Sequence, residues 1–433
     1  MENICGWIAQ AGSSAGRARL SGTQKADWLV IGAGITGLCA AHTLAQMHPQ
    51  ARIVVVDRQR AAQGASARNS GFVVAHEHPG NDELIGGEGF AGFEIDTSIS
   101  RAASEEVRQR ITRHDIACDF RDCGYYFAVS DRAKLTHVEA KLATLRALGA
   151  SAQFLQGEQL SQKLGTRHYQ AAIWCGHGNA LLQPAKYVKG LLNALPDTVT
   201  LYENTDITGL ERLGQGRIRA NGIDGSIEAK QVLVCLNAFI PRAGIDGSAT
   251  FPMELSASLT RPLSDEEFRA FGGVEPWGVL STRPLGATVR LTPDRRVMIR
   301  NTAEYRSRDL SDSDLLIRRK HHVLGLQRRF PWLTEQDIQY TWTGHLSASR
   351  SGQPYFAKVE EGLFAVAGCN GSGVARGTLW GRLLAELASG ASSPMLQSVM
   401  HRAQPGWLPP RPLLDIGAML RMRVEAVRAR TEI

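Results

Sequence analysis

The sequence has few cysteines, and they follow no recognised pattern. There are seven, an odd number, and none of them forms a C-x-x-C pair. This argues against a disulfide framework or a zinc site and favours reduced thiols in a cytoplasm. The chain also lacks a run approaching the roughly 18 apolar residues of a membrane helix. Its N-terminal segment lacks the charged start and apolar core of a signal peptide. We therefore expect a cytoplasmic protein without a membrane span.

Charge excludes further classes of protein. Charged residues make up 21% of the chain and hydrophobic residues 43%, which is normal for a globular protein and excludes extensive disorder. The net charge is +7, but the basic residues occur as scattered pairs and triplets. This favours a modestly basic surface over a nucleic-acid groove. At 433 residues the chain exceeds one ordinary core, so two or three domains, or one domain with a large insertion, are expected.

The most informative stretch has the pattern strand, glycine loop, helix, strand. Residues 28–31 are an apolar run typical of a buried parallel strand, and 32–37 read G-x-G-x-x-G. Residues 38–47 have apolar side chains at helical spacing, and 52–56 read as a second buried strand. Asp57 then follows 20 positions after the third glycine, where a carboxylate can hold a ribose hydroxyl. The sequence therefore predicts a dinucleotide site.

Each glycine of this loop has its own physical reason. Gly32 permits a tight turn out of the strand, and Gly34 lets the backbone approach a pyrophosphate. Gly37 lets the helix and the strand pack closely. The pyrophosphate would then lie against free N–H groups at the start of the helix, where Ile35 and Thr36 stand.

The rest of the chain alternates between helices and short strands. The N-terminal segment reads as a small-residue arm laid over the surface. The last buried strand runs into a second glycine-rich loop, at 368–373. Strands are expected at 124–129, 198–202, 206–212, 217–221, 226–236, 253–260, 287–291, 296–300, 340–344 and 363–367. Helices are expected at 98–114, 131–148, 185–195, 312–330, 374–388 and 416–430.

Three glycine-rich segments together carry a family resemblance. They are the fingerprint at 30–37 with Asp57, the segment G-A-S-A-R-N-S-G at 64–71, and the closing loop at 368–373. With them the chain resembles the FAD-dependent D-amino acid oxidase superfamily, whose members include glycine oxidase and sarcosine oxidase. The segment 64–71 and an N-terminal arm carrying Trp7 are similar to the gamma-glutamylputrescine oxidase branch.

The resemblance implies an α/β fold. A discontinuous Rossmann-like FAD-binding domain would carry an inserted α+β substrate domain built on an antiparallel sheet. The expected pieces are an N-terminal arm at 1–25, the FAD-binding domain at 26–95, 160–250 and 335–395, the substrate domain at 96–159 and 251–334, and a C-terminal tail at 396–433.

The resemblance also implies the cofactor and the residues that meet it. Asp57 would hold the adenosine ribose, and backbone near Ile207 would meet the adenine. Some amine-oxidising relatives attach the flavin through a cysteine near the position of Trp342, but 340–343 has no cysteine, so we expect non-covalent FAD. The expected cofactor-binding residues are Gly32, Gly34, Ile35, Thr36, Gly37, Asp57, Arg58, Ala65, Ser66, Arg68, Asn69, Ser70, Gly71, Ile207, Asn237, Gly368, Asn370, Gly371, Ser372 and Gly373.

Three residues are candidates for a catalytic role. A positive charge on Arg68 near the flavin would stabilise its reduced form, although a loop–surface ion pair is the alternative. Arg300 could clamp a substrate carboxylate bidentately, or it could be an ordinary surface arginine. His345, with Tyr305 and Trp342, could line a substrate pocket, although aromatic residues at strand ends belong more often to a core.

Other residues near these segments have weaker signals. His76 and His78 could face the substrate or relay protons. Their spacing also suggests a metal site, but no third ligand is evident and no metal is expected. Cys369, in the closing loop, is expected to be a small packing residue.

The resemblance implies oxidation of the C–N bond of a small-molecule amine or amino acid. Hydride transfer to flavin N5 would give an imine that hydrolyses, and oxygen or another acceptor would reoxidise the flavin. A hydroxy-acid dehydrogenase that oxidises C–O is one alternative. A flavin-bearing partner or RNA-associated subunit is another, suggested by the basic segment 421–430. Nothing in the sequence indicates the oligomeric state.

Overall fold

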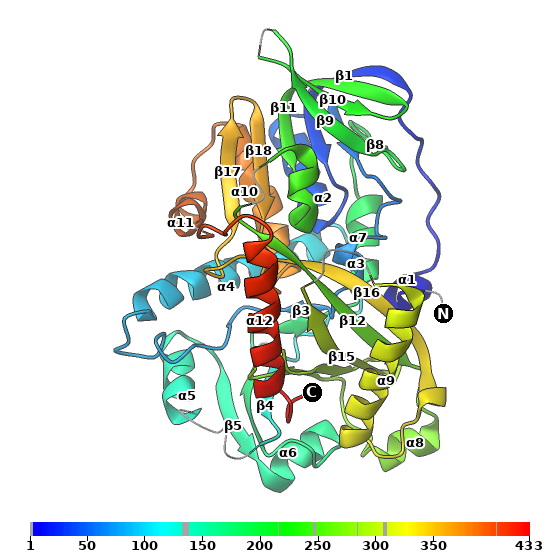
Figure 1. Cartoon of the computed structure of the whole chain (residues 1–433), viewed down its shortest axis with the longest axis vertical. Helices are drawn as coiled ribbons and strands as arrows, with labels where there is room; N and C mark the ends of the chain where they lie inside the picture. The colour runs from blue at the N-terminus through cyan, green and yellow to red at the C-terminus, as the bar shows by residue number, and fades with distance from the viewer. Residues whose placement is uncertain are drawn as a thin grey trace.

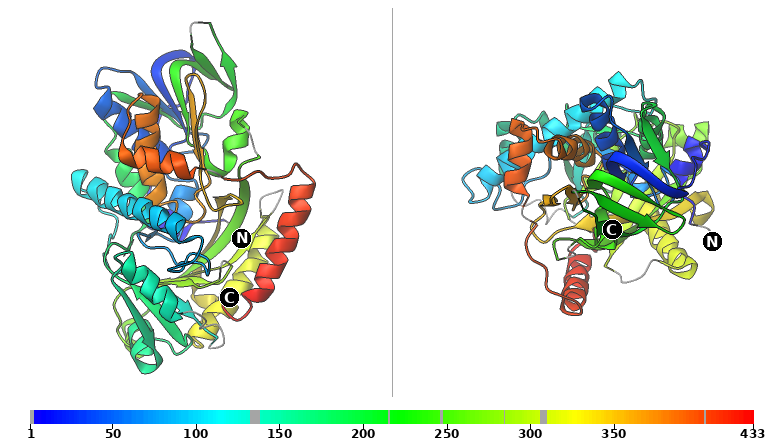
Figure 2. Two further views of the ribbon diagram at one scale, coloured as in Figure 1. Left: turned by 90° about the vertical axis from the view of Figure 1, so that its left-hand side faces the viewer. Right: turned by 90° about the horizontal axis from the view of Figure 1, so that it is seen from above.

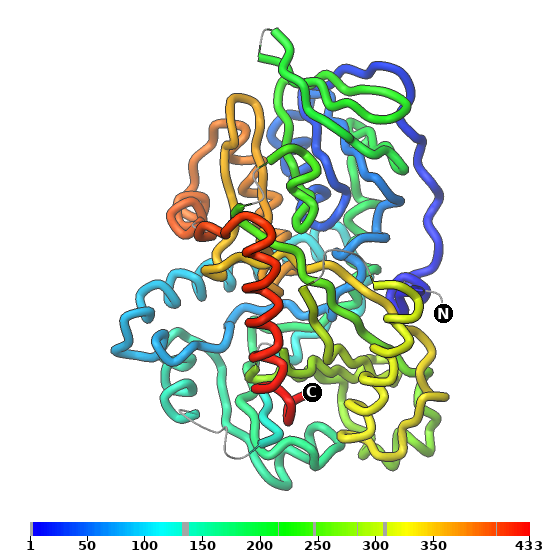
Figure 3. The backbone as a smooth tube through the Cα atoms, viewed as in Figure 1, coloured from blue at the N-terminus to red at the C-terminus, as the bar shows by residue number. Residues whose placement is uncertain are grey.

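Two eight-stranded sheets form the framework of the molecule, one in each half of Figure 1. The computed structural model describes residues 3–131, 138–214, 216–245, 248–283, 285–305, 310–403 and 405–433. The colours of the tube in Figure 3 show that each half combines segments from distant parts of the chain. The chain therefore passes between the two halves repeatedly, and both sheets contribute to what lies between them.

The first sheet is mainly parallel and has a buried centre. Its valine-rich and isoleucine-rich inner strands are inaccessible on both faces, as a parallel sheet covered by helices requires. Only β17 and the β9–β10 pair run antiparallel to their neighbours. The strand order is β17 (Tyr355–Glu360), β18 (Leu363–Ala367), β11 (Gly225–Val234), β1 (Gly22–Ile31), β2 (Ile53–Val56) and β8 (Val199–Tyr202), with β9 (Ile207–Arg212) and β10 (Ile218–Gly222) joined through β11.

The second sheet is antiparallel except where β13 meets β4. A two-stranded sheet of β3 (Phe72–Val73) and β7 (Ala180–Leu181) completes the described strands. The order of the second sheet is β16 (Ile338–Ala348), β12 (Phe251–Thr260), β15 (Val297–Glu304), β14 (Thr288–Leu291), β13 (Gly278–Ser281), β4 (Tyr125–Val129), β6 (Ala171–Cys175) and β5 (Ala152–Gln156).

Helices cover the first sheet and support the glycine loop. The first helix after the loop, α2 (Ile35–Met47), packs against α10 (Ala375–Ala388) so closely that a Cβ on Gly381 would lie 2.3 Å from the carbonyl oxygen of Thr36. The other helices are α1 (Gly6–Ala11), α3 (Ala65–Arg68), α4 (Phe90–Arg113), α5 (Val138–Ala147), α6 (Gly157–Leu164), α7 (Pro184–Asn193), α8 (Asp265–Ala270), α9 (Asp312–Arg329), α11 (Pro394–Arg402) and α12 (Leu413–Arg428), with 3-10 turns η2 (Asn237–Ala243) and η3 (Glu335–Asp337). None of the helices in the described ranges has the length and apolar character to cross a bilayer.

The structure corrects several predictions about elements. Helix α4 begins at Phe90, eight residues before the predicted start, and segment 64–71 contains the short helix α3 rather than only a loop. Strand β16 extends well beyond the predicted 340–344. The sequence also did not predict β5, β6, β13, β17, α6 or α8. Of the helix predicted at 131–148, residues 132–137 lie outside the described part of the chain.

The predicted division into domains stays a proposal. At two places a strand assigned to the FAD-binding domain belongs to the second sheet. β6 lies inside the segment 160–250 assigned to the FAD-binding domain, yet it pairs with β4 and β5 of the second sheet. β16 lies inside 335–395, yet it pairs with β12. Both strands therefore link the two halves.

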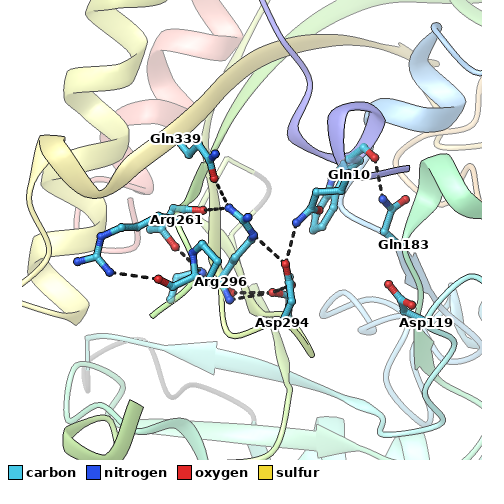
Figure 4. Close-up of polar contacts among 12 residues, drawn as sticks. Gln10, Asp119, Gln183, Arg261, Asp294, Arg296 and Gln339 are labelled. Carbon is cyan, nitrogen blue, oxygen red and sulfur yellow. Dashed lines mark hydrogen bonds and ion pairs between the residues drawn. The ribbon is translucent and has the colours of Figure 1, made fainter. Parts of the chain in front are cut away.

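Part of the N-terminal segment belongs to the core: α1 is packed there, whereas residues 12–19 are mostly exposed, as the prediction of a surface arm has it. Trp7 in α1 is 1% exposed and meets Trp342 edge-on, with ring centroids 6.1 Å apart. Gln183 Nε2 donates to the carbonyl of Trp7 at 2.7 Å, and Gln10 Nε2 donates to Asp294 Oδ2 at 2.8 Å (Figure 4). Burial of an indole and these polar contacts tie the segment to the second sheet.

The C-terminal segment lies along the outside of the second half (Figure 2), and Arg328 near the end of α9 donates from Nη1 to the Ile433 carbonyl at 2.8 Å. α12 begins at Leu413, three residues before the predicted helix. Beyond it, Glu432 is 1% exposed and accepts a hydrogen bond from the Ser130 N–H at 3.1 Å. Its carbonyl accepts from the Ala287 N–H at 2.9 Å, so the end of the chain is anchored to the second sheet.

Candidate active site

A cavity of about 610 Å³ is lined by loops of the first sheet and strands of the second. From the first sheet come the glycine loop and the closing loop before α10. From the second come β12, β15 and β16, with the turn that follows β13. Fourteen of the predicted cofactor-binding residues line this cavity, and ten of them lie in two segments, 65–71 and 370–373. The fourteen are Gly34, Ile35, Thr36, Ala65, Ser66, Arg68, Asn69, Ser70, Gly71, Asn237, Asn370, Gly371, Ser372 and Gly373.

The structure does not bring every predicted residue to this cavity. Gly32 and Gly37, the two ends of the loop, pack against backbone: a Cβ on Gly32 would lie 2.6 Å from the carbonyl oxygen of Cys235. Arg58 is exposed after β2, and Ile207 is buried at the start of β9, away from the cavity wall. The predicted residues that do not line the cavity are Gly32, Gly37, Asp57, Arg58, Ile207 and Gly368. Their roles toward a cofactor stay predictions.

The glycine loop packs without room for side chains. A Cβ on Gly37 would lie 1.8 Å from the Gly32 carbonyl oxygen, and one on Gly34 would lie 2.7 Å from Ser66 Oγ. Asp57 Oδ2 accepts a hydrogen bond from the Ala33 N–H at 2.8 Å, which attaches the end of β2 to the loop. Burial raises the pKa of the Asp57 carboxyl. The loop thus has the close backbone geometry that a pyrophosphate needs.

The side chain of Ser66 contacts the start of α2. Its Oγ accepts a hydrogen bond from the Ile35 N–H at 3.0 Å. That N–H is among the first of the helix, the groups that a phosphate would meet. Ser66 therefore lies beside the N–H groups that a pyrophosphate would meet, and its position relative to the flavin ring stays a prediction.

Arg68 is held from several sides by neutral oxygen atoms. Its Nε donates to the Gln63 carbonyl at 2.8 Å, and its Nη1 donates to the Thr343 carbonyl and to Asn3 Oδ1, both at 3.1 Å. Trp342 Nε1 donates to the Arg68 carbonyl at 2.9 Å. Within the described ranges Arg68 forms no ion pair, which disfavours the alternative of a loop–surface ion pair.

The side chain of Asn69 forms hydrogen bonds within its own loop. Its Nδ2 donates to the Ser66 carbonyl at 2.7 Å, and its Oδ1 accepts from the Gly71 N–H at 2.9 Å. These bonds shape the turn after α3, so the amide acts on its own loop and not as an outward donor.

The closing loop is attached to the segment after β3 by a carboxylate. Glu77 Oε1 accepts a hydrogen bond from Ser372 Oγ at 2.9 Å and forms an ion pair with Arg376 Nη2 at 2.8 Å. Arg376 is buried at the start of α10. Glu77 therefore fixes one wall of the cavity, a role that sequence reasoning missed because the contact joins residues almost 300 positions apart.

Arg300 lies in β15 and lines the cavity, so it is not an ordinary surface arginine. It faces Thr288 across the β14–β15 ladder, and its Nη2 donates to Thr288 Oγ1 at 2.6 Å. Burial lowers the pKa of its guanidinium to about 10, which leaves it charged at neutral pH. No carboxylate pairs with it among the described residues, so its charge is available to a ligand.

The predicted aromatic residues divide between the cavity and the core. Trp342 and His345 line the cavity, and the His345 ring meets Phe239 edge-on at 5.1 Å. Tyr305 does not line it, because its hydroxyl donates to Asp415 of the C-terminal helix. Cys369 lines the cavity and lies 3.4 Å from Asn237 Nδ2.

The two predicted histidines also have different positions. His78 lines the cavity and stacks on Phe127, with ring centroids 4.1 Å apart. His76 is buried behind it, with its Nδ1 3.4 Å from Asn179 Nδ2. Burial lowers the pKa of both imidazoles, to about 3 for His78 and about 4 for His76, so both are neutral at pH 7.

Sequence reasoning also missed a buried arginine that supports the site. Arg290 donates from Nη1 to the carbonyls of Ser70 and Leu182, both at 2.8 Å, and its guanidinium lies over the Trp7 ring at 5.1 Å. It thereby connects β14 to the turn after α3. A charged residue in a polar–apolar alternation gives no signal of such a contact.

These loops and this cavity agree with the match of the sequence to a family model. The model for FAD dependent oxidoreductases of the DAO type matches residues 27–387. The chain belongs to this family. Its curated relatives include gamma-glutamylputrescine oxidoreductase of Escherichia coli, 27% identical over 367 residues that cover 84% of each chain. Probable oxidoreductase OrdL of Haemophilus influenzae is 25% identical over 379 residues, which cover 86% of this chain and 84% of the relative.

Solved structures show the same fold. Glycine oxidase from Geobacillus kaustophilus superposes with a TM-score of 0.69 at 16% identity, over 86% of this chain and 96% of that one. L-proline dehydrogenase from P. horikoshii gives a TM-score of 0.71 at 18% identity, over 89% and 100% of the chains. The protein is thus a DAO-family flavoprotein whose cofactor is FAD, and the predicted fold class is confirmed.

The glycine loop and the closing loop of the cavity fit this cofactor. The positions of the cysteines lead to a prediction about whether the flavin is bound covalently. The β16 stretch at 340–343 has no cysteine, while Cys235 and Cys369 line the cavity. We expect acid precipitation of the yellow holoenzyme to release all of its flavin into the supernatant, because no cysteine lies at the attachment position. Colour that remains in the pellet would contradict this. A Cys369→Ser variant compared with Cys235→Ser would then identify the cysteine responsible.

Proposed function

We propose that this protein oxidises the C–N bond of a small amine or amino acid that carries a carboxylate. The observation that carries the proposal is Arg300, a half-buried, charged guanidinium without a carboxylate partner among the described residues, in the same cavity as the glycine loop. An arginine fork is well suited to a carboxylate. The curated relative named for an amine substrate supports C–N oxidation over C–O oxidation.

In the proposed reaction, one group of residues would hold the cofactor. Asp57, with Gly32, Gly34 and Gly37, would hold the ribose and pyrophosphate, and the loop at 370–373 would lie along the flavin. Bound FAD supplies the acceptor for the two electrons that leave the substrate when its C–H bond breaks. The substrate loses two electrons and two protons and becomes an imine, and water converts the imine to an aldehyde or oxo acid and an amine or ammonia.

The remaining candidates would orient the substrate and exclude water. Arg300 would hold the carboxylate, and Trp342 and His345 would form the wall beside it. Arg68, placed by Thr343 and Gln63, would add positive charge near the flavin. A cytoplasmic location stays part of the proposal, and it is supported by the seven cysteines, none of which forms a disulfide.

An anaerobic titration of the holoenzyme tests this function. We expect loss of the visible flavin absorbance on addition of one class of amine or amino acid, and recovery of the colour when air or an artificial acceptor is supplied. A matched panel pairs each amino acid with the hydroxy acid of the same side chain. Bleaching by hydroxy acids alone would reject C–N oxidation and would support the alternative dehydrogenase.

A further inference from the structure

A second cavity of about 200 Å³ lies next to the first. Both spaces are lined by His78, Phe127, Lys141, Thr282 and Arg283. We call this shared wall the passage, since a ligand that extends from one space into the other must cross it. Beyond the passage the wall is mostly apolar. Asn81 is its polar member, and its apolar side chains come from β4, β5, β6 and the start of α5, namely Val129, Val138, Phe154, Ala171, Ala172 and Ile173. An elongated ligand could therefore extend past the predicted reaction centre.

Two cations without bound partners stand at this passage. Neither the Lys141 ammonium nor the Arg283 guanidinium forms a hydrogen bond or an ion pair with any described residue. Burial and the nearby charge of Arg283 lower the pKa of Lys141, while the charge of Glu83 opposes this shift. Glu83 Oε2 accepts a hydrogen bond from the Gly80 N–H at 2.6 Å and does not pair with Lys141. Two neighbouring cations repel each other, and an anion between them would relieve that repulsion.

A polar atom at the same place also lacks a partner. His78 Nδ1 is buried and has no hydrogen-bond partner among the described residues. The ring is fixed against Phe127 and is neutral at pH 7, so it can offer one donor and one acceptor. A buried polar atom of this kind is costly unless a ligand or water satisfies it.

The charged residues of the cavity wall also favour an anion at the passage. Its wall includes the cations Arg68, Lys141, Arg283 and Arg300, whereas its carboxylate, Glu77, is already paired with Arg376. One carboxylate of a substrate would satisfy Arg300 and leave the passage unsatisfied.

We propose that Lys141 and Arg283, with His78, form a second anion subsite that binds a distal carboxylate of the substrate. The substrate class is then an amine or amino acid with two carboxylates, joined by a chain whose apolar part lies along Phe127. This inference rests on the proposed function for the identity of the first carboxylate site, while the second subsite is defined by its own residues.

Binding of non-reacting probes to the holoenzyme tests the subsite. The probes are the α,ω-dicarboxylates from succinate to suberate, each compared by calorimetry with the monocarboxylate of the same chain length. We expect at least one dicarboxylate to bind about tenfold or more tightly than its monocarboxylate, the size of one charge-assisted hydrogen bond. Equal affinities throughout the series would overturn the inference.

Variants of the passage residues test whether these residues cause the tighter binding of dicarboxylates. In the double variant Lys141→Met, Arg283→Gln the dicarboxylate advantage should disappear, while monocarboxylate binding should stay within about twofold. Lys163→Met, an exposed lysine of α6 outside both cavities, is the matched control and should keep the advantage. An advantage that survives in the double variant would overturn the inference.

The result is separable from the test of the proposed function. Probe binding needs no oxidation, so the advantage can be measured even if no amine bleaches the flavin. In that case the anion subsite stands and the assignment of the reaction fails. If amines bleach the flavin and dicarboxylates have no advantage, the reaction stands and the subsite is rejected.

Discussion

Gly37→Ala is expected to give a protein that is less stable by about 3 kcal/mol or more and that no longer retains FAD. The added Cβ would lie 1.8 Å from the Gly32 carbonyl oxygen and 3.2 Å from the Val30 side chain. Backbone cannot yield as a flexible side chain can, so α2 must move away from β1. This movement would displace the Ile35 N–H and its neighbours at the start of the helix, which are the expected contacts of the pyrophosphate.

The measurement combines denaturant unfolding with the ratio of flavin absorbance to protein absorbance after purification. Gly209→Ala is the matched control, because a Cβ at Gly209 in β9 would meet nothing within 4 Å. The control should keep both its flavin and its stability within about 1 kcal/mol, the usual cost of a harmless substitution. A Gly37→Ala protein with full flavin content and unchanged unfolding would show that α2 is not held by this contact.

Arg300→Gln is expected to lower kcat/KM for carboxylate-bearing substrates about 30-fold or more, while the flavin spectrum stays unchanged. Removal of one member of a buried charge pair costs roughly 2–5 kcal/mol, and each 1.4 kcal/mol is a factor of ten. The loss of flavin should be small, because within the described part of the chain the side chain of Arg300 donates only to Thr288 Oγ1, inside the second sheet. A Gln side chain keeps a hydrogen-bond donor and leaves no charge unpaired.

Two comparisons make this prediction specific. Arg300→Lys keeps the charge but loses the planar fork, so it should be intermediate between the wild type and Arg300→Gln. An amine without a carboxylate should be oxidised by Arg300→Gln and by the wild type at rates within about threefold, given that it makes no charge pair to lose. An equal loss for both kinds of substrate would show that Arg300 supports the fold or the flavin and does not bind a carboxylate.

The nucleotide-binding half was largely predictable, for a local reason. The strand, loop and helix that begin at 28 occupy one continuous stretch, and their signals act between near neighbours. Apolar runs specify β1 and β2, helical spacing specifies α2, and the glycine pattern specifies the turn between them. The structure confirms these three elements and shows why Gly37 has no side chain.

Other elements could not be predicted, because packing overrides their local signal. Helix α4 begins inside a glycine-rich segment that has little intrinsic helix propensity, and it lies against α10 and α11 (Figure 1). β6, with the sequence AAIWC, pairs on both edges with β4 and β5, and such pairing depends on strands far apart in the chain. The N-terminal Trp7 reads as part of an arm until Trp342, more than 300 positions later, covers it.

By itself, the sequence determined the family, the cofactor and the glycine loop, since each depends on residues close together in the chain. The tertiary structure decided which charges meet a ligand. Arg290, Arg300, Arg283 and Lys141 look alike in the sequence, as single basic residues between polar and apolar neighbours. One supports a turn, one faces the main cavity, and two belong to the passage beside the second cavity. Strand pairing and burial place them, and these forces act between segments that the sequence keeps far apart.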